Sequence, residues 1–312
     1  MDYGYIVNRA FQIAWKYKSL WVFGLFVGGF TNFNVDLPTN SFSFDPESAE
    51  LPFHISPEII AALLLVGFVL FILFLAAYCI SAPALIDGVN RIERGGVYRF
   101  GASFSAGVDY FFRILGLGVL YFLTVFVSMV ILTLIFIFVA ILAGVSLGDS
   151  GAGPAIAIFL LGLLILIPLL LFVYLIIMTP FSLAQRVIVV RNAPISDALS
   201  EGWLLFKRNF GKSMLIYLIN LGISLAVIIA LAVLFAVVAL IVIIFVPDPM
   251  EHITEFIILG IVFGLPISLL LGGFFGTFHS ALYTLFYFEL VEPAAGRQIA
   301  AQTPPIIPGT AG

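Results

Sequence analysis

Runs of apolar residues that are long enough to cross a lipid bilayer constrain this chain more than any other feature. The hydrocarbon core of a bilayer takes about 20 helical residues. Apolar runs of at least that length cover about residues 59–86, 114–147, 155–183, 213–246 and 257–290, and a shorter one covers about 19–31. Only 10% of the 312 residues are charged, whereas a soluble domain has about 25%. We therefore predict an all-α, polytopic transmembrane helix bundle.

Small residues recur at every fourth position of the last run. They are Gly260, Gly264, Ser268, Gly272, Gly276 and Ser280. On a helix of about 3.6 residues per turn, this spacing forms a row along one side. Lipid offers little hydrophobic force for helix association, so membrane helices pack by close backbone approach at such rows. We predict that other helices pack on this row; the alternative is that glycine is simply common in membrane helices.

Basic residues alternate between the connections of the runs. All 13 lysines and arginines lie in residues 1–18, 87–113, 184–212 or 291–312, and none lies in 31–57, 148–154 or 247–256. Cytoplasmic loops carry the excess of such residues. The pattern predicts six spans with both termini in the cytoplasm, and it makes the short run 19–31 the first span. We expect one transmembrane domain over residues 1–290 and a flexible cytoplasmic tail over 291–312.

Three amphipathic stretches precede pairs of spans, at about residues 4–18, 100–112 and 195–210. Apolar and polar positions alternate in them with helical spacing, so we predict helices that lie in the membrane interface. Ala10 and Ala14 of the first stretch align with Ala198 and Gly202 of the third. The pattern favours three repeats of an interfacial helix plus a hairpin of spans, or else chance similarity among amphipathic helices.

Polar residues inside the spans are the usual indicators of function in membrane proteins. His279 lies in the last span near the row of small residues, and Asn220 lies in the fifth span. His279 is a candidate for proton relay or ligand binding. The simpler interpretation is that both side chains make structural hydrogen bonds between helices.

Basic residues of the cytoplasmic segments have aromatic neighbours, which is typical of contacts with lipid headgroups. The candidates are Arg94, Arg99, Lys207, Arg208 and Lys212. Such residues attract anionic lipids. They also satisfy the orientation rule without any further role.

Motifs for metals, cofactors and catalysis are not found in the sequence. The three histidines are scattered, Cys79 is the one cysteine, and Gly95-Gly96 has neither the spacing nor the lysine of a phosphate-binding loop. We expect no cofactor, no metal, no nucleic-acid partner and no enzymatic activity.

Three segments resemble a family of prokaryotic six-span membrane proteins. They are AWKYKSLWVFG at 14–24, IDGVNRIERGG at 86–96 and DALSEGWLLFKRNF at 197–210. The chain is similar there to the membrane domain that precedes the catalytic domain of some bacterial glycerophosphoryl diester phosphodiesterases, and to stand-alone relatives. Only the short segment 291–312 follows the sixth span in this sequence, so we expect no catalytic residue to carry over from the resemblance. The resemblance implies a protein of the prokaryotic cytoplasmic membrane that is concerned with lipids or envelope assembly.

These observations favour a non-enzymatic integral membrane protein that organises lipids or partner proteins, with membrane lipids and either a protein partner or a second copy of the chain as its partners. The rival hypothesis is a transporter or channel for a hydrophobic or lipid-like substrate. Pro168 and Pro266 lie within spans and are expected to kink them, as occurs in transporters. The scarcity of polar residues in the spans favours the first hypothesis.

Overall fold

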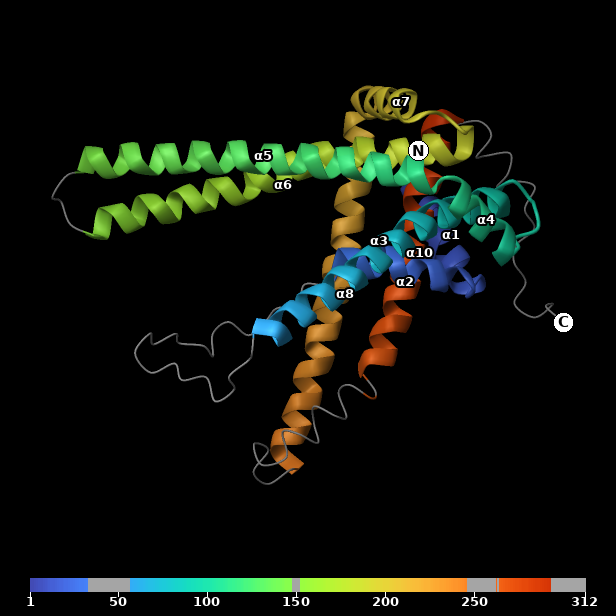
Figure 1. The fold of residues 1–312 in the computed structure, drawn as a ribbon, viewed down its shortest axis with the longest axis horizontal. Helices are drawn as coiled ribbons and strands as arrows, with labels where there is room; N and C mark the ends of the chain where they lie inside the picture. The colour runs from blue at the N-terminus through green and yellow to red at the C-terminus, as the bar shows by residue number, and fades with distance from the viewer. Residues whose placement is uncertain (33–56, 148–151, 246–261, 263, 293–312) are drawn as a thin grey trace. The chain divides into compact units, whose positions relative to one another are not determined.

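The computed structural model describes residues 1–32, 57–147, 152–245, 262 and 264–292, and it has no strand among them. The helices are α1 (Tyr3–Lys16), α2 (Leu20–Asn32), α3 (Pro57–Glu93), α4 (Phe100–Asp109), α5 (Phe111–Leu147), α6 (Ala152–Arg191), α7 (Ile195–Arg208), α8 (Phe210–Phe245) and α10 (Leu265–Val291) (Figure 1). The predicted all-α fold class is therefore confirmed for the described residues. The predicted position Gly260 and the tail from 293 onward lie outside them.

Five of the described helices are long and apolar enough to cross a membrane. These segments are Glu58–Glu93, Phe111–Phe138, Leu166–Arg191, Phe210–Leu234 and Pro266–Val291. The prediction of a multi-pass membrane protein is thereby confirmed. α2 has 13 residues, a length of about 20 Å at 1.5 Å per residue, so the sixth crossing stays a prediction.

The long helices α3 and α6 continue past the ends expected from the apolar runs. We expected spans to end at about residues 86 and 183, whereas α3 ends at Glu93 and α6 at Arg191. At 37 residues, α3 is about 55 Å long, well above the roughly 30 Å of hydrocarbon. A helix that leaves the bilayer no longer needs apolar side chains, so hydropathy alone places its end too early.

Proline interrupts neither α3 nor α6. Pro83 lies within α3, and Pro168 and Pro180 lie within α6. Pro266 is in the first turn of α10. The described residues just before α10, 262 and 264, have π-helical geometry, so the helical geometry changes next to Pro266, where a break or kink was expected.

Burial divides α3 and α5 along their lengths. In α3, the large side chains from Ile59 to Phe74 are exposed, and most apolar side chains from Cys79 to Ile92 are buried. In α5, the buried residues end at Leu117 and exposed apolar residues follow. The protein core therefore lies at the helix ends that adjoin the basic segments, and the exposed apolar lengths are suited to contact with lipid.

The described helices belong to two compact units, and the boundary between them falls within α1 and α10. The first, which we call the α2–α4 unit, comprises residues 7–111 and 250–282. Within it, α3 packs against both α2 and α4. The second, the α5–α8 unit, comprises residues 1–6, 112–249 and 283–312. Within it, α7 packs on α6 and contacts α8, and α5 runs beside α6 with Tyr121 and Phe181 in ring contact at 5.2 Å (Figure 1).

A residue with a left-handed backbone follows both α3 and α6. Gly95 has φ 71° and Asn192 has φ 54°, and each comes twelve residues after a proline, Pro83 or Pro180. At α3, the Gly96 N–H bonds the Arg91 carbonyl at 2.9 Å and the Gly95 N–H bonds the Ile92 carbonyl at 3.3 Å. This pair of bonds is the Schellman motif, which closes a helix and turns the chain back. α3 and α6 thus share a left-handed residue just after the helix.

In the α2–α4 unit, α2 crosses α10 with its backbone almost in contact. A Cβ atom added to Gly24 would collide with the Gly273 carbonyl oxygen, and one added to Gly276 would collide with the Gly24 carbonyl oxygen. A Cβ atom on Gly28 would lie 2.6 Å from the Gly272 carbonyl oxygen. Only glycine allows this approach, which strengthens dispersion contacts between the helices.

The predicted row of small residues is used along part of its length. Gly276 and Ser280 are buried, whereas a Cβ atom on Gly272 would meet only Leu25, at 3.9 Å. Gly264 has open space around it, and exposed Ser268 donates a hydrogen bond to the Gly264 carbonyl at 2.7 Å. The close crossing therefore involves the half of the row that lies nearer the basic ends.

We predict that Gly276→Leu destabilises the protein in detergent, because the added side chain has no space beside Gly24. Overpacking costs about 1–3 kcal/mol in cores that can shift, so the melting temperature should fall by several degrees. Gly264→Leu, in the same row with open space, is the matched control and should melt like the wild type. Equal melting of both variants would show that the α2–α10 crossing does not stabilise the fold.

Candidate membrane-interface site

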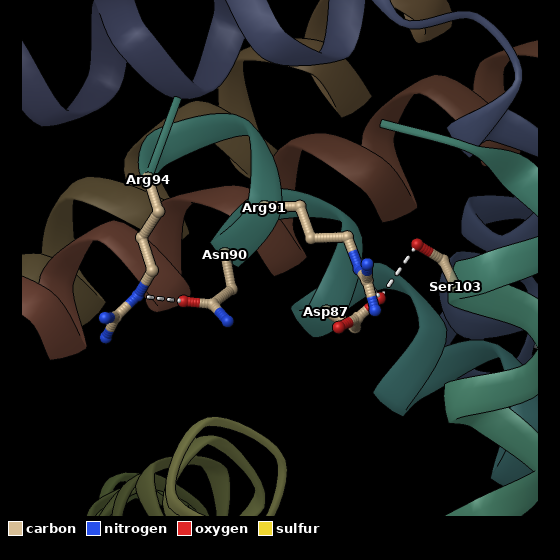
Figure 2. Close-up of polar contacts among 5 residues, drawn as sticks. All are labelled: Asp87, Asn90, Arg91, Arg94 and Ser103. Carbon is tan, nitrogen blue, oxygen red and sulfur yellow. Dashed lines mark hydrogen bonds and ion pairs between the residues drawn. The ribbon is translucent and has the colours of Figure 1, made fainter. Parts of the chain in front are cut away.

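Polar side chains cluster on the last two turns of α3 (Figure 2). Arg91 donates from Nε to Oδ2 of Asp87 at 2.7 Å, and the hydroxyl of Ser103 donates to the same oxygen at 3.0 Å. Arg94 donates from Nε to Oδ1 of Asn90 at 2.8 Å. Since Ser103 belongs to α4, the carboxylate of Asp87 joins the end of α3 to the short helix that follows it.

A buried ion pair joins α1 to α3. Arg9 Nε lies 2.7 Å from Glu93 Oε1, and the two side chains are only 10% and 6% exposed. A buried charge that loses its partner is costly, since desolvation is no longer offset by attraction. The pair therefore ties the position of α1 to the end of α3.

The α5–α8 unit has comparable polar links at the end of α6. Arg191 forms an ion pair with Glu201 of α7, and Arg113 of α5 donates to the side-chain oxygen of Asn192 at 2.6 Å. The Arg191–Glu201 pair is partly exposed, so water and salt weaken it. α7 is thus tied to α6 by a weaker ion pair than the one that ties α1 to α3.

Small buried residues let the short helices lie close against the long ones. A Cβ atom on Gly107 of α4 would collide with the Ile80 carbonyl oxygen of α3, and one on Gly202 of α7 would lie 2.6 Å from the Pro180 carbonyl oxygen of α6. Each glycine has a fully buried small residue four positions earlier, Ser103 or Ala198. Buried alanines occur at the same spacing in α1, at positions 10 and 14.

Aromatic rings hold α1 and α2 to α10 within the α2–α4 unit. The ring of Phe274 lies 5.6 Å from that of Phe11, 6.2 Å from that of Trp15 and 5.7 Å from that of Trp21. The indole N–H of Trp21 donates to the Ala14 carbonyl at 2.6 Å. Trp15 remains 61% exposed, as expected of an aromatic side chain at a membrane interface.

Tyr98 lies in the connection between α3 and α4 and packs against both neighbouring segments of its unit. Its ring lies 5.9 Å from that of Tyr17, and a Cβ atom on Gly88 would lie 3.2 Å from it. Burial raises the pKa of the Tyr98 hydroxyl, and the nearby carboxylate of Asp87 adds to the rise. The side chain is therefore neutral at physiological pH and packs as an aromatic group.

The five predicted lipid-headgroup residues differ in their surroundings. Arg94 is exposed but bonded to Asn90. The other four are exposed, and none has a carboxylate partner within the part of the chain that the structure describes: Arg99, Lys207, Arg208 and Lys212. Lys207 Nζ lies 5.1 Å from the centroid of the Trp203 ring, within the range of a cation–π contact. The structure therefore leaves positive charge exposed around α7 and the start of α8.

The two predicted polar residues of the spans have local partners. His279 of α10 is half-buried, with its ring 5.7 Å from that of Phe278. Asn220 lies in α8 and is also half-buried. Both side chains take part in interactions within the protein, and the described residues contain no group of three or more His, Cys, Asp or Glu that could hold a metal ion.

The sequence pattern does not predict that Arg186 is buried. Arg186 lies in α6, is 5% exposed, and donates to the Ser182 carbonyl at 2.6 Å and to its hydroxyl at 2.8 Å. Its guanidinium carbon lies 5.6 Å from the centroid of the Tyr283 ring. The apolar run ends near residue 183, so the sequence predicts that Arg186 lies in the connection that follows. The four-residue spacing from Ser182 was the local signal that α6 continues.

Comparison with protein-family models, with curated proteins and with solved structures finds no match to this chain. The resemblance to the phosphodiesterase membrane domain therefore stays a prediction.

We predict strong coupling between Arg9 and Glu93 in a double-mutant cycle of detergent stability. Arg9→Met or Glu93→Met alone leaves one buried charge unpaired, a loss of about 3–5 kcal/mol, whereas the double variant replaces both charges by apolar groups and should lose much less. Additive losses in the double variant would contradict a buried pair. Arg191→Met with Glu201→Met serves as the exposed comparison, for which coupling of at most about 1 kcal/mol is expected.

Proposed function

We propose that this chain is a non-enzymatic multi-pass protein of the cytoplasmic membrane whose basic face binds anionic lipids and so organises lipids or partner proteins. One observation carries the proposal. Most arginines near the span ends contact acidic or polar groups of the protein, as Arg9, Arg91 and Arg191 do with carboxylates. The four exposed basic residues described above have no such partner in the described part of the chain and are available to headgroups.

Lipids are a suitable partner for these residues because they border membrane spans. Each exposed Lys or Arg near an anionic membrane surface contributes about 1 kcal/mol of attraction. Exposed aromatic side chains accompany them, including Trp15 and Trp203, and such rings favour the headgroup level. Both features concentrate on the short helices α1, α4 and α7 and their connections, which supports an interfacial position for these helices.

The topology that we propose has six crossings, with α2 as the first and both termini in the cytoplasm. The distribution of all 13 basic residues supports it, since positive residues remain on the cytoplasmic side. The close crossing of α2 with α10 supports a membrane position for α2 despite its length.

We further propose that α1, α4 and α7 each begin one of three helix–hairpin repeats; their buried small residues at a spacing of four support this. A prokaryotic origin has only the sequence resemblance in its favour.

One observation favours the rival function, transport of a hydrophobic or lipid-like substrate. Arg186 and Tyr283 place a guanidinium and a phenol together inside segments that are apolar enough to span the membrane. Ionisable groups at such positions often line the pathway of a substrate. The exposed basic residues at and near the span ends are not explained by this function, so we prefer lipid organisation.

Cysteine labelling tests the topology. In a Cys79→Ser background, single cysteines at Asp2, Ser196 and Asp248 are exposed in turn to a membrane-impermeant maleimide on intact cells. We expect labelling at position 248 alone, with positions 2 and 196 labelled only after permeabilisation. Labelling at position 2 together with position 248 would show that α2 does not cross the membrane.

Native mass spectrometry of the gently extracted wild-type protein tests the function. We expect retained phospholipid in which anionic species exceed their share of the membrane, because exposed cations select them. Retention in proportion to membrane composition would contradict lipid organisation by charge. A retained apolar small molecule in place of phospholipid would favour the rival function, and a protein in fixed stoichiometry would reveal the partner.

A further inference from the structure

We infer that the elbow between α7 and α8 is a binding site for the phosphate of an anionic phospholipid. We define this elbow by Trp203, Lys207, Arg208, Phe210 and Lys212. The inference rests on the proposed function and makes it specific, since it assigns headgroup binding to one place on the basic face.

The elbow is compact because a single residue separates the two helices. α7 ends at Arg208 and α8 begins at Phe210. The backbone N–H of Asn209 bonds the carbonyls of Leu205 and Phe206 at 3.1 and 3.2 Å, and its side-chain amide also bonds the Leu205 carbonyl, at 3.2 Å. Asn209 thus closes α7 and fixes the point at which the chain turns into α8.

Aromatic rings pack along the inner side of the elbow. The ring of Phe206 lies 5.9 Å from that of Trp203 and 5.4 Å from that of Phe210. Phe206 is 4% exposed, whereas Trp203 and Phe210 are 41% and 42% exposed. The buried ring therefore anchors the elbow, and the two exposed rings offer apolar surface beside the cations.

Three cations occur within six residues at this turn, at Lys207, Arg208 and Lys212, and all three are exposed. The acidic residues of α7 do not neutralise them in the structure: Glu201 pairs with Arg191, and Asp197 accepts a hydrogen bond from Ser196 at 3.1 Å. Positive charge at the elbow is consequently left for an external anion. A phospholipid phosphate fits this arrangement, because α8 continues from the elbow as an apolar segment that is able to cross the membrane.

The corresponding positions at the end of α3 are less suited to a headgroup. Arg91 is held by Asp87 and Arg94 by Asn90 (Figure 2). At the α1–α2 connection, Lys16 and Lys18 are exposed, and this stretch of the chain has two cations where the elbow has three. These residues supply a matched control for net charge.

The test compares two triple variants with the wild type by native mass spectrometry in detergent, with phosphatidylglycerol or phosphatidylcholine added in steps. The elbow variant is Lys207→Gln/Arg208→Gln/Lys212→Gln, and the control is Lys16→Gln/Lys18→Gln/Arg94→Gln, in which Arg94 is the arginine bonded to Asn90. We expect the wild type and the control to bind phosphatidylglycerol in preference to phosphatidylcholine. The elbow variant should bind it about tenfold more weakly or worse, with phosphatidylcholine binding unchanged.

The outcomes separate this inference from the function on which it rests. A wild type without preference for phosphatidylglycerol would overturn both. A wild type with that preference and an equal loss in the two triple variants would overturn the elbow site alone, since total charge would then explain the effect. Displacement of the lipid by millimolar inorganic phosphate would also overturn it.

Two further variants distinguish the loss of positive charge from misfolding of the elbow variant. Lys207→Arg/Lys212→Arg keeps the charge and should keep the preference for phosphatidylglycerol, and Lys212→Gln alone should weaken it in part. Melting temperatures without added lipid show that each variant is folded. Full preference retained in a folded Lys207→Gln/Arg208→Gln/Lys212→Gln protein would contradict the site.

Discussion

Close approach of helix backbones through small side chains is the interaction on which the rest of the structure depends. In a bilayer, apolar side chains gain little by leaving lipid, so helices associate where their surfaces fit closely. Here α2 meets α10 at Gly24 and Gly276, α4 meets α3 at Gly107, and α7 meets α6 at Gly202. All of these contacts lie toward the basic ends of the long helices. The remaining lengths of α3 and α5 expose apolar side chains that suit lipid.

Charged groups at the same ends divide into two classes with different roles. The Arg9–Glu93 pair is buried and fixes α1 against α3, and Asp87 links α3 to α4 through Ser103. The cations of the α7–α8 elbow have no acidic partner in the described residues. We interpret the first class as structural and the second as the part of the protein that interacts with lipid headgroups. The short helices α1, α4 and α7 connect the two classes, because the contacts that hold them also position the exposed cations.

Local sequence patterns predicted the helices and the membrane-spanning class, since apolar length and helical spacing are properties of neighbouring residues. The row of small residues in the last span was visible in the sequence, but its contact with α2 at Gly276 and its open side at Gly264 depend on where α2 lies. The Arg9–Glu93 pair joins residues 84 positions apart, a separation at which a single sequence carries no signal. Arg186 belongs to α6 although the apolar run ends near residue 183, because hydropathy does not show how far a helix continues past its apolar residues.

Spin labels on α7 test whether this helix lies in the membrane interface. The experiment uses bilayers with phosphatidylglycerol and compares the access of oxygen and of a water-soluble nickel reagent to each label. Two labels lie on one flank of α7, at Leu199 and Trp203. The other two lie on its outer face, at Asp197 and Ser200. Our account predicts oxygen access at the first two positions and nickel access at the other two, with helical periodicity. Nickel access at all four would place α7 in water and contradict the account.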